Sequence, residues 1–130
     1  MKYLLIALLF TSLVSCSGSD TVEVGNKTTM EIDKVFDAGT VVKGEMITAK
    51  FKLENTGSYP LVIAEVKGSC SCTVAEYPEE PIAPGETAEI MAHVNTDKTG
   101  AGIINKSVRV VANTKPSITQ LQVKASVRAR

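Results

Sequence analysis

Three cysteines are the residues of this 130-residue sequence whose spacing says most about chemistry. Cys16 follows Leu13-Val14-Ser15 near the N-terminus, whereas Cys70 and Cys72 form a Cys-x-Cys pair in the middle of the chain. A protein thiol can be acylated, oxidised to a disulfide or bound to a soft metal ion. The sequence around each cysteine decides which of these reactions is open to it.

Cys16 ends a segment with the layout of an export signal. Lys2 precedes an apolar run from residue 3 to residue 10, which is too short to cross a bilayer as a permanent helix. Leu13-Val14-Ser15-Cys16 resembles the lipobox of bacterial lipoproteins, in which a small residue precedes the cysteine that is acylated and becomes the new N-terminus. We therefore expect a signal peptide over residues 1–15 and a lipid on Cys16. The alternative is an ordinary secretory signal with an incidental cysteine.

Residues 16–28 are expected to form a tether, because Ser, Gly, Asp, Asn and Thr predominate there. Several acyl chains on one terminus make a stable anchor, since each buried methylene contributes about 0.8 kcal/mol. Ser17 after the cysteine, in place of Asp, resembles signals that permit export to the outer membrane. These features predict a protein held on the bacterial cell envelope, at the periplasmic side or the surface of the outer membrane.

Cys70 and Cys72 have several open interpretations. In an extended chain their Cα atoms would be about 6.6 Å apart, near the upper limit for a disulfide, and a bend would bring them closer. A ring this small would add only about 1.6 kcal/mol of stability by the chain-entropy estimate. The pair is a local clasp that shapes a turn, a thiol-redox site, or part of a soft-metal site for Cu(I) or Zn(II).

The soft-metal interpretation needs further ligands, and Met91 and His93 are the weak candidates. His93 is the single histidine of the sequence. Both residues alternate with apolar neighbours, so the plainer interpretation places them on the polar face of a strand. No cofactor is expected on this evidence.

Charge and missing motifs exclude several classes of function. The chain has 14 Lys plus Arg and 14 Asp plus Glu, and removal of residues 1–15 with Lys2 leaves 13 against 14. This balance would not attract nucleic acid. Glycine-rich phosphate loops, an HExxH zinc motif and a recognisable nucleophile with its base are all missing. We therefore expect a protein that is not an enzyme.

The rest of the chain shows the period-two alternation of strands. Apolar residues alternate with polar ones most clearly over residues 47–53, 88–94 and 121–127. Shorter candidates cover residues 30–36, 61–67, 73–77 and 106–112, and turn residues such as Gly, Pro and Asn separate them. The pattern predicts one all-β domain over residues 29–130, an immunoglobulin-like antiparallel β-sandwich of about seven strands.

The turn motifs resemble those of a bacterial family catalogued as domain of unknown function 1573. The resemblance covers residues 30 to 128, and it depends on Phe36-Asp37-Ala38-Gly39-Thr40-Val41-Val42-Lys43-Gly44, Asn55-Thr56-Gly57, Ser69-Cys70-Ser71-Cys72-Thr73, Pro84-Gly85-Glu86 and Asn95-Thr96-Asp97. The usual central motif of the family is Cys-Gly-Cys, and Ser71 replaces the glycine here. The resemblance implies a sandwich like those of major sperm protein and pilus chaperones, and it implies no activity.

Two functional hypotheses follow. The first is a lipid-anchored, non-enzymatic binding or structural module, which contacts the membrane through its N-terminal lipid and binds an envelope protein or glycan through a sheet edge or its loops. The second is a thiol-redox or soft-metal-handling protein that uses Cys70 and Cys72.

Overall fold

A computed structural model describes residues 25–130, which form eight strands. The strands and one 3-10 turn are β1 (Met30–Ile32), β2 (Val35–Val42), β3 (Met46–Asn55), β4 (Ile63–Gly68), β5 (Thr73–Glu76), β6 (Thr87–Asn95), η1 (Thr96–Lys98), β7 (Gly102–Ala112) and β8 (Ile118–Arg128). Cys16 and the predicted signal peptide lie outside the described residues, as does the predicted tether up to residue 24.

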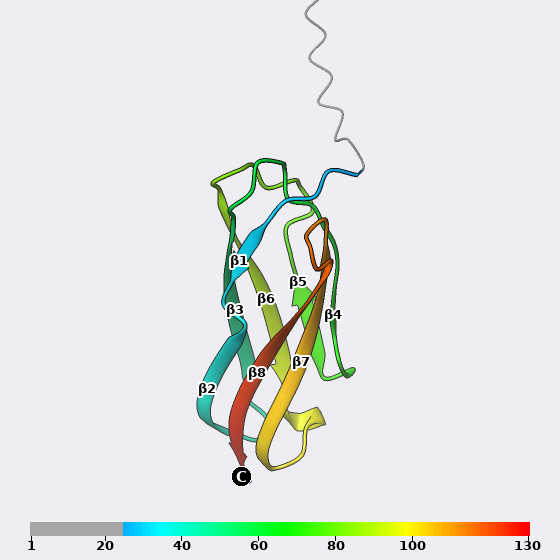
Figure 1. Cartoon of the computed structure of the whole chain (residues 1–130). Coiled ribbons are helices and arrows are strands. Elements are labelled where there is room, and N and C mark those ends of the chain that lie inside the picture. The colour runs from blue at the N-terminus through cyan, green and yellow to red at the C-terminus, as the bar shows by residue number, and fades with distance from the viewer. Residues whose placement is uncertain (1–24) are drawn as a thin grey trace, which may run out of the picture.

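The strands form two four-stranded sheets that pack face to face (Figure 1). The first sheet has the order β1-β3-β6-β5, and the second has the order β2-β8-β7-β4. The described part of the chain starts at one end of the sandwich, and the C-terminus lies at the other (Figure 1). The two stacked sheets confirm the sandwich expected from the period-two pattern.

The largest difference from the predicted strands lies between residues 30 and 42. Residues 30–36 were expected to form a single strand, but the chain leaves the first sheet and joins the second within this stretch. The Asp33 N–H donates to the Lys52 carbonyl of the first sheet at 3.3 Å, while the carbonyl of Lys34 accepts from the Gln122 N–H of the second sheet at 2.7 Å. The predicted strand is thereby split into β1 and the start of β2, and β2 continues to Val42, beyond the predicted end at residue 36. The structure therefore has eight strands where about seven were expected.

The same crossing explains the one pairing that is not antiparallel. β2 pairs in parallel with β8, from Val35 opposite Gln122 to Val42 opposite Arg128. All other strand pairs of the two sheets are antiparallel. The expectation of purely antiparallel sheets is therefore wrong for this pair, because the chain crosses from β1 to β2 without a turn and so runs in the same direction as β8.

The core lies between the two sheets and follows the alternation of the sequence. In β3, buried Ile47, Ala49, Phe51 and Leu53 alternate with exposed polar residues. Phe51 meets Phe36 edge to face, with ring centroids 6.4 Å apart. Each fully buried side chain of this size contributes about 1.5–3 kcal/mol to stability.

A buried amide organises the loops at the end where the chain enters. Asn55 is fully buried, and its side-chain N–H groups donate to the carbonyls of Tyr59 and Ile82, each at 2.8 Å. Its side-chain oxygen accepts from the Thr28 hydroxyl at 2.8 Å and the Gly57 N–H at 3.1 Å. One side chain thus joins three separate segments of the chain.

Candidate functional site

The structure joins Cys70 and Cys72 in a disulfide whose Cα atoms are 5.2 Å apart. Both cysteines lie in the connection between β4 and β5, where the chain passes from the second sheet to the first. The Thr73 N–H donates to the Cys70 carbonyl at 3.2 Å, which bends the chain back on itself. A bend that brings the two cysteines closer together was expected to favour a disulfide, and the structure has this bend.

The disulfide is held against the core. Cys72 is 3% exposed and belongs to the buried apolar cluster, whereas Cys70 is only partly buried. The Thr73 hydroxyl lies 3.7 Å from the Cys70 sulfur and 3.6 Å from the Cys72 sulfur. The carbonyl of Cys72 also accepts from the Asn95 N–H of β6 at 2.8 Å. These contacts fix the corner and cover one of the two sulfurs.

Met91 and His93 lie on β6, and the structure does not gather them with the cysteines. Thr48 and Glu76 flank His93 across the outer face of the first sheet, with its Nδ1 3.2 Å from the Thr48 hydroxyl and its Nε2 3.5 Å from the Glu76 carboxylate. Cys72 instead packs into the core. Within residues 25–130 no group of three or more His, Cys, Asp or Glu side chains could hold a metal ion.

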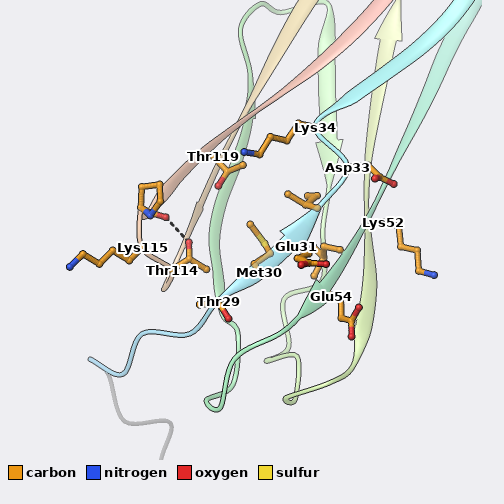
Figure 2. Close-up of a pocket in the computed structure, with 13 residues that line it drawn as sticks. Thr29, Met30, Glu31, Asp33, Lys34, Lys52, Glu54, Thr114, Lys115 and Thr119 are labelled. Carbon is orange, nitrogen blue, oxygen red and sulfur yellow. Dashed lines mark hydrogen bonds between the residues drawn. The ribbon is translucent and has the colours of Figure 1, made fainter.

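A groove of about 720 Å³ opens at the side of the sandwich, between β1 and the start of β8 (Figure 2). Sequence reasoning did not find it. The groove is lined by Thr29, Met30, Glu31, Ile32, Asp33, Lys34, Lys52, Leu53, Glu54, Thr114, Lys115, Pro116 and Thr119. The lining contains no Cys, His or Ser side chain.

The β8 side of the groove is a free strand edge. Gln122 donates its N–H toward β2, and the direction of backbone groups alternates along a strand, so Ile118 and Gln120 also direct theirs away from β7. β2 begins only at Val35, opposite Gln122. Ile118 and Gln120 therefore have no strand beside them in the second sheet.

The β1 side is a second free edge. The carbonyl of Thr29 accepts from Thr56, and the N–H of Asp33 donates to Lys52, so odd-numbered residues direct their backbone groups toward β3. By the same alternation Met30 and Ile32 direct theirs away from β3. The groove thus lies between two unpaired edges, one from each sheet.

The charged side chains that line the groove point in different directions. Lys34 extends toward Thr119, while Asp33 points the opposite way (Figure 2). Lys115 lies on the turn before β8, whereas the remaining carboxylates, Glu31 and Glu54, come from β1 and β3. The whole lining has three Lys and three acidic residues, and Lys34 is the Lys whose side chain is directed toward β8 (Figure 2). The chain crosses between the sheets at the end of this groove. The sequence signal for this crossing is the polar pair Asp33-Lys34, which interrupts two apolar stretches.

The described part of the chain offers no helix of the length and apolarity needed to cross a membrane.

Comparison with known proteins gives a family and a fold. The family model described as "Protein of unknown function (DUF1573)" matches residues 27–127. No curated protein matches the sequence.

Several solved structures are similar. A protein of unknown function from Porphyromonas gingivalis W83 is 20% identical with a TM-score of 0.69, and the match covers 84% of this chain and 51% of that chain. The PapD-like domain 7 of human CEP192 is 12% identical with a TM-score of 0.63, covering 80% and 88%. The secreted serine protease VesC from Vibrio cholerae is 12% identical with a TM-score of 0.60, covering 77% and 23%. These similarities confirm the immunoglobulin-like fold, and this chain spans about half of the P. gingivalis structure.

Proposed function

This chain belongs to the DUF1573 family of proteins of unknown function, and from that premise we propose that it is a lipid-anchored, non-enzymatic binding module of the bacterial envelope. Its binding site is the groove between β1 and β8. The observation that carries the proposal is the pair of unpaired strand edges that border this groove: Met30 and Ile32 on one side, and on the other Ile118 and Gln120, the neighbours of the lining residue Thr119. Free backbone groups on an edge supply affinity for an added extended segment.

The anchor supports the same proposal. The lipobox at Cys16 would attach the domain through its N-terminal side. The first described residues lie close to the groove, because the Asn113 side chain donates to the Asn26 carbonyl at 3.0 Å and the next residue, Thr114, lines the groove. A domain attached in this way would keep the groove close to the membrane that carries the lipid. Its partner would then be a protein of the same envelope.

Thiol-disulfide chemistry at Cys70 and Cys72 is the second candidate, and the disulfide itself favours it. Exchange requires attack on one of the sulfurs by an external thiolate. The burial of Cys72 leaves Cys70 as the more accessible sulfur. The double variant Cys70→Ser/Cys72→Ser separates the two candidates, because only the second requires sulfur.

The test is a photo-crosslink in living cells. A photoreactive phenylalanine analogue replaces Thr119 inside the groove or, as the control, Lys124, which is exposed on β8 beside the already paired β2. We expect a crosslinked envelope protein from position 119, none from position 124, and the same adduct in the double cysteine variant. Absence of an adduct at position 119 would contradict the groove as the binding site, and loss of the adduct with the cysteines would favour the thiol function.

A further inference from the structure

We infer that the groove accepts the C-terminal end of an extended polypeptide, which pairs in parallel with β8 and places its terminal carboxylate beside Lys34. This inference rests on the proposed function and goes further, because it names the part of the partner that binds. Three properties of the groove support it: its closed end, its charge and its free backbone groups.

The groove is closed at one end by the chain itself. Asp33 is hydrogen-bonded to the first sheet and Lys34 to the second, so their peptide bond spans the seam. Beyond this point β2 already occupies the place beside β8. An added strand has only the four residues Ile118 to Leu121 to pair with, about 13 Å at about 3.3 Å per residue, and then it must stop. A partner polypeptide that ends at this point fits the groove better than one that continues.

The positive charge of Lys34 at the closed end of the groove favours the carboxyl terminus of a partner over its amino terminus. The Lys34 side chain extends into the groove toward Thr119, and the neighbouring Asp33 carboxylate points away (Figure 2). A terminal carboxylate there gains a charge-assisted interaction, whereas a terminal ammonium would be repelled. The carboxyl end therefore lies at Lys34.

This polarity sets the direction of the added strand. A chain that enters near Lys115 and ends at Lys34 runs in the same direction as β8 and β2. The Gln120 N–H is the last free donor on this edge before Lys34, so it donates to the terminal carboxylate or to the carbonyl just before it. Half-buried Met30 and Ile32 face the incoming strand and favour apolar, β-branched side chains at alternate positions.

The experiment uses the full chain in detergent and a defined probe. The probe is an N-terminally biotinylated heptapeptide pool with Val or Ile at alternate positions and random residues between them, made as free acids and as C-terminal amides. We expect the free acids to be retained about tenfold more than the amides. Lys34→Gln should abolish this preference, Lys34→Arg should keep it, and the exposed control Lys124→Gln should not change it.

Equal retention of acids and amides would overturn the inference, as would no retention of either pool. Far-ultraviolet circular dichroism of the Lys34 variants confirms that each one is folded. Mapping of the Thr119 crosslink by mass spectrometry separates this inference from the proposed function. An adduct on an internal segment of the partner would leave the groove as the binding site and refute capture of a chain end.

Discussion

Gly68 and Thr73 pack so closely that a β-carbon on Gly68 would lie 2.6 Å from the Thr73 β-carbon and 2.9 Å from its carbonyl oxygen. Gly68 ends β4 in the second sheet and Thr73 begins β5 in the first, so their contact marks the corner where the chain changes sheets. Thr73 then places its hydroxyl near both sulfurs of the disulfide. The missing side chain at position 68 is therefore what allows the cysteine corner to close.

Gly68→Ala should lower the free energy of unfolding by about 1–3 kcal/mol, because the added methyl group overpacks a rigid corner. Gly100→Ala is the matched control, since a β-carbon there meets no atom within 4 Å and its backbone is outside the left-handed region. The control should change stability by no more than about 0.5 kcal/mol. Urea unfolding followed by circular dichroism measures both, and equal midpoints for the two variants would contradict the packing argument.

Cys70→Ser/Cys72→Ser should keep the fold and lose only about 1–2 kcal/mol of stability. The reason is that the disulfide closes a very small ring, so it removes little entropy from the unfolded chain. Thermal unfolding with and without a reductant gives the measurement. Reductant should lower the midpoint of the parent protein slightly and leave that of the variant unchanged; a collapse of the parent fold on reduction would show that the disulfide does more than clasp a corner.

Asn55→Asp should destabilise the protein by at least about 3 kcal/mol. The substitution replaces an amide that donates to the carbonyls of Tyr59 and Ile82 with a buried carboxylate that has no N–H to give. Asn105→Asp makes the same chemical change at an exposed position of β7 and serves as the control. Urea unfolding at neutral pH compares them, and similar losses for both would contradict the role assigned to the buried amide.

The sequence predicted those parts of the fold that depend on local alternation. Phe51 and its neighbours in β3 are buried at every second position, as expected. The division of β1 from β2 was not predicted, because a polar pair such as Asp33-Lys34 marks an interruption without saying which sheet the chain joins next. The parallel pairing of β2 with β8 was also missed, since strand partners so distant in the sequence leave no local pattern.

The candidate sites show the same contrast between features that are local in the sequence and features that depend on distant residues. Cys70 and Cys72 were identified because their chemistry and spacing are local, and the disulfide agrees with one of the interpretations left open. The groove was not identified, because Lys34 and Thr119 meet only after both sheets have formed. A strand edge is free when no other strand pairs with it, and no residue type in the sequence predicts this.

Cys16→Ala should release the protein from the membrane fraction. Acylation of this cysteine is the predicted anchor, and residues 25–130 offer no spanning helix to replace it. Partitioning between detergent-rich and aqueous phases measures the change, with Ser17→Ala as the control that keeps the lipidated cysteine. If the parent protein itself partitions into the aqueous phase, the lipoprotein interpretation is wrong.

Gln120→Pro should abolish the Thr119 crosslink and the capture of peptides while costing little stability. Proline removes a backbone N–H, and the one on Gln120 is directed toward the groove and not toward β7. Leu121→Pro, one residue further along β8, removes an N–H that is directed toward β7, so it should cost about 3 kcal/mol or more. Urea unfolding and peptide retention, measured on both variants, therefore test the edge assignment directly. A Gln120→Pro protein that is as unstable as Leu121→Pro would mean that this N–H already has a partner, and one that still captures peptides would mean that binding does not use this edge.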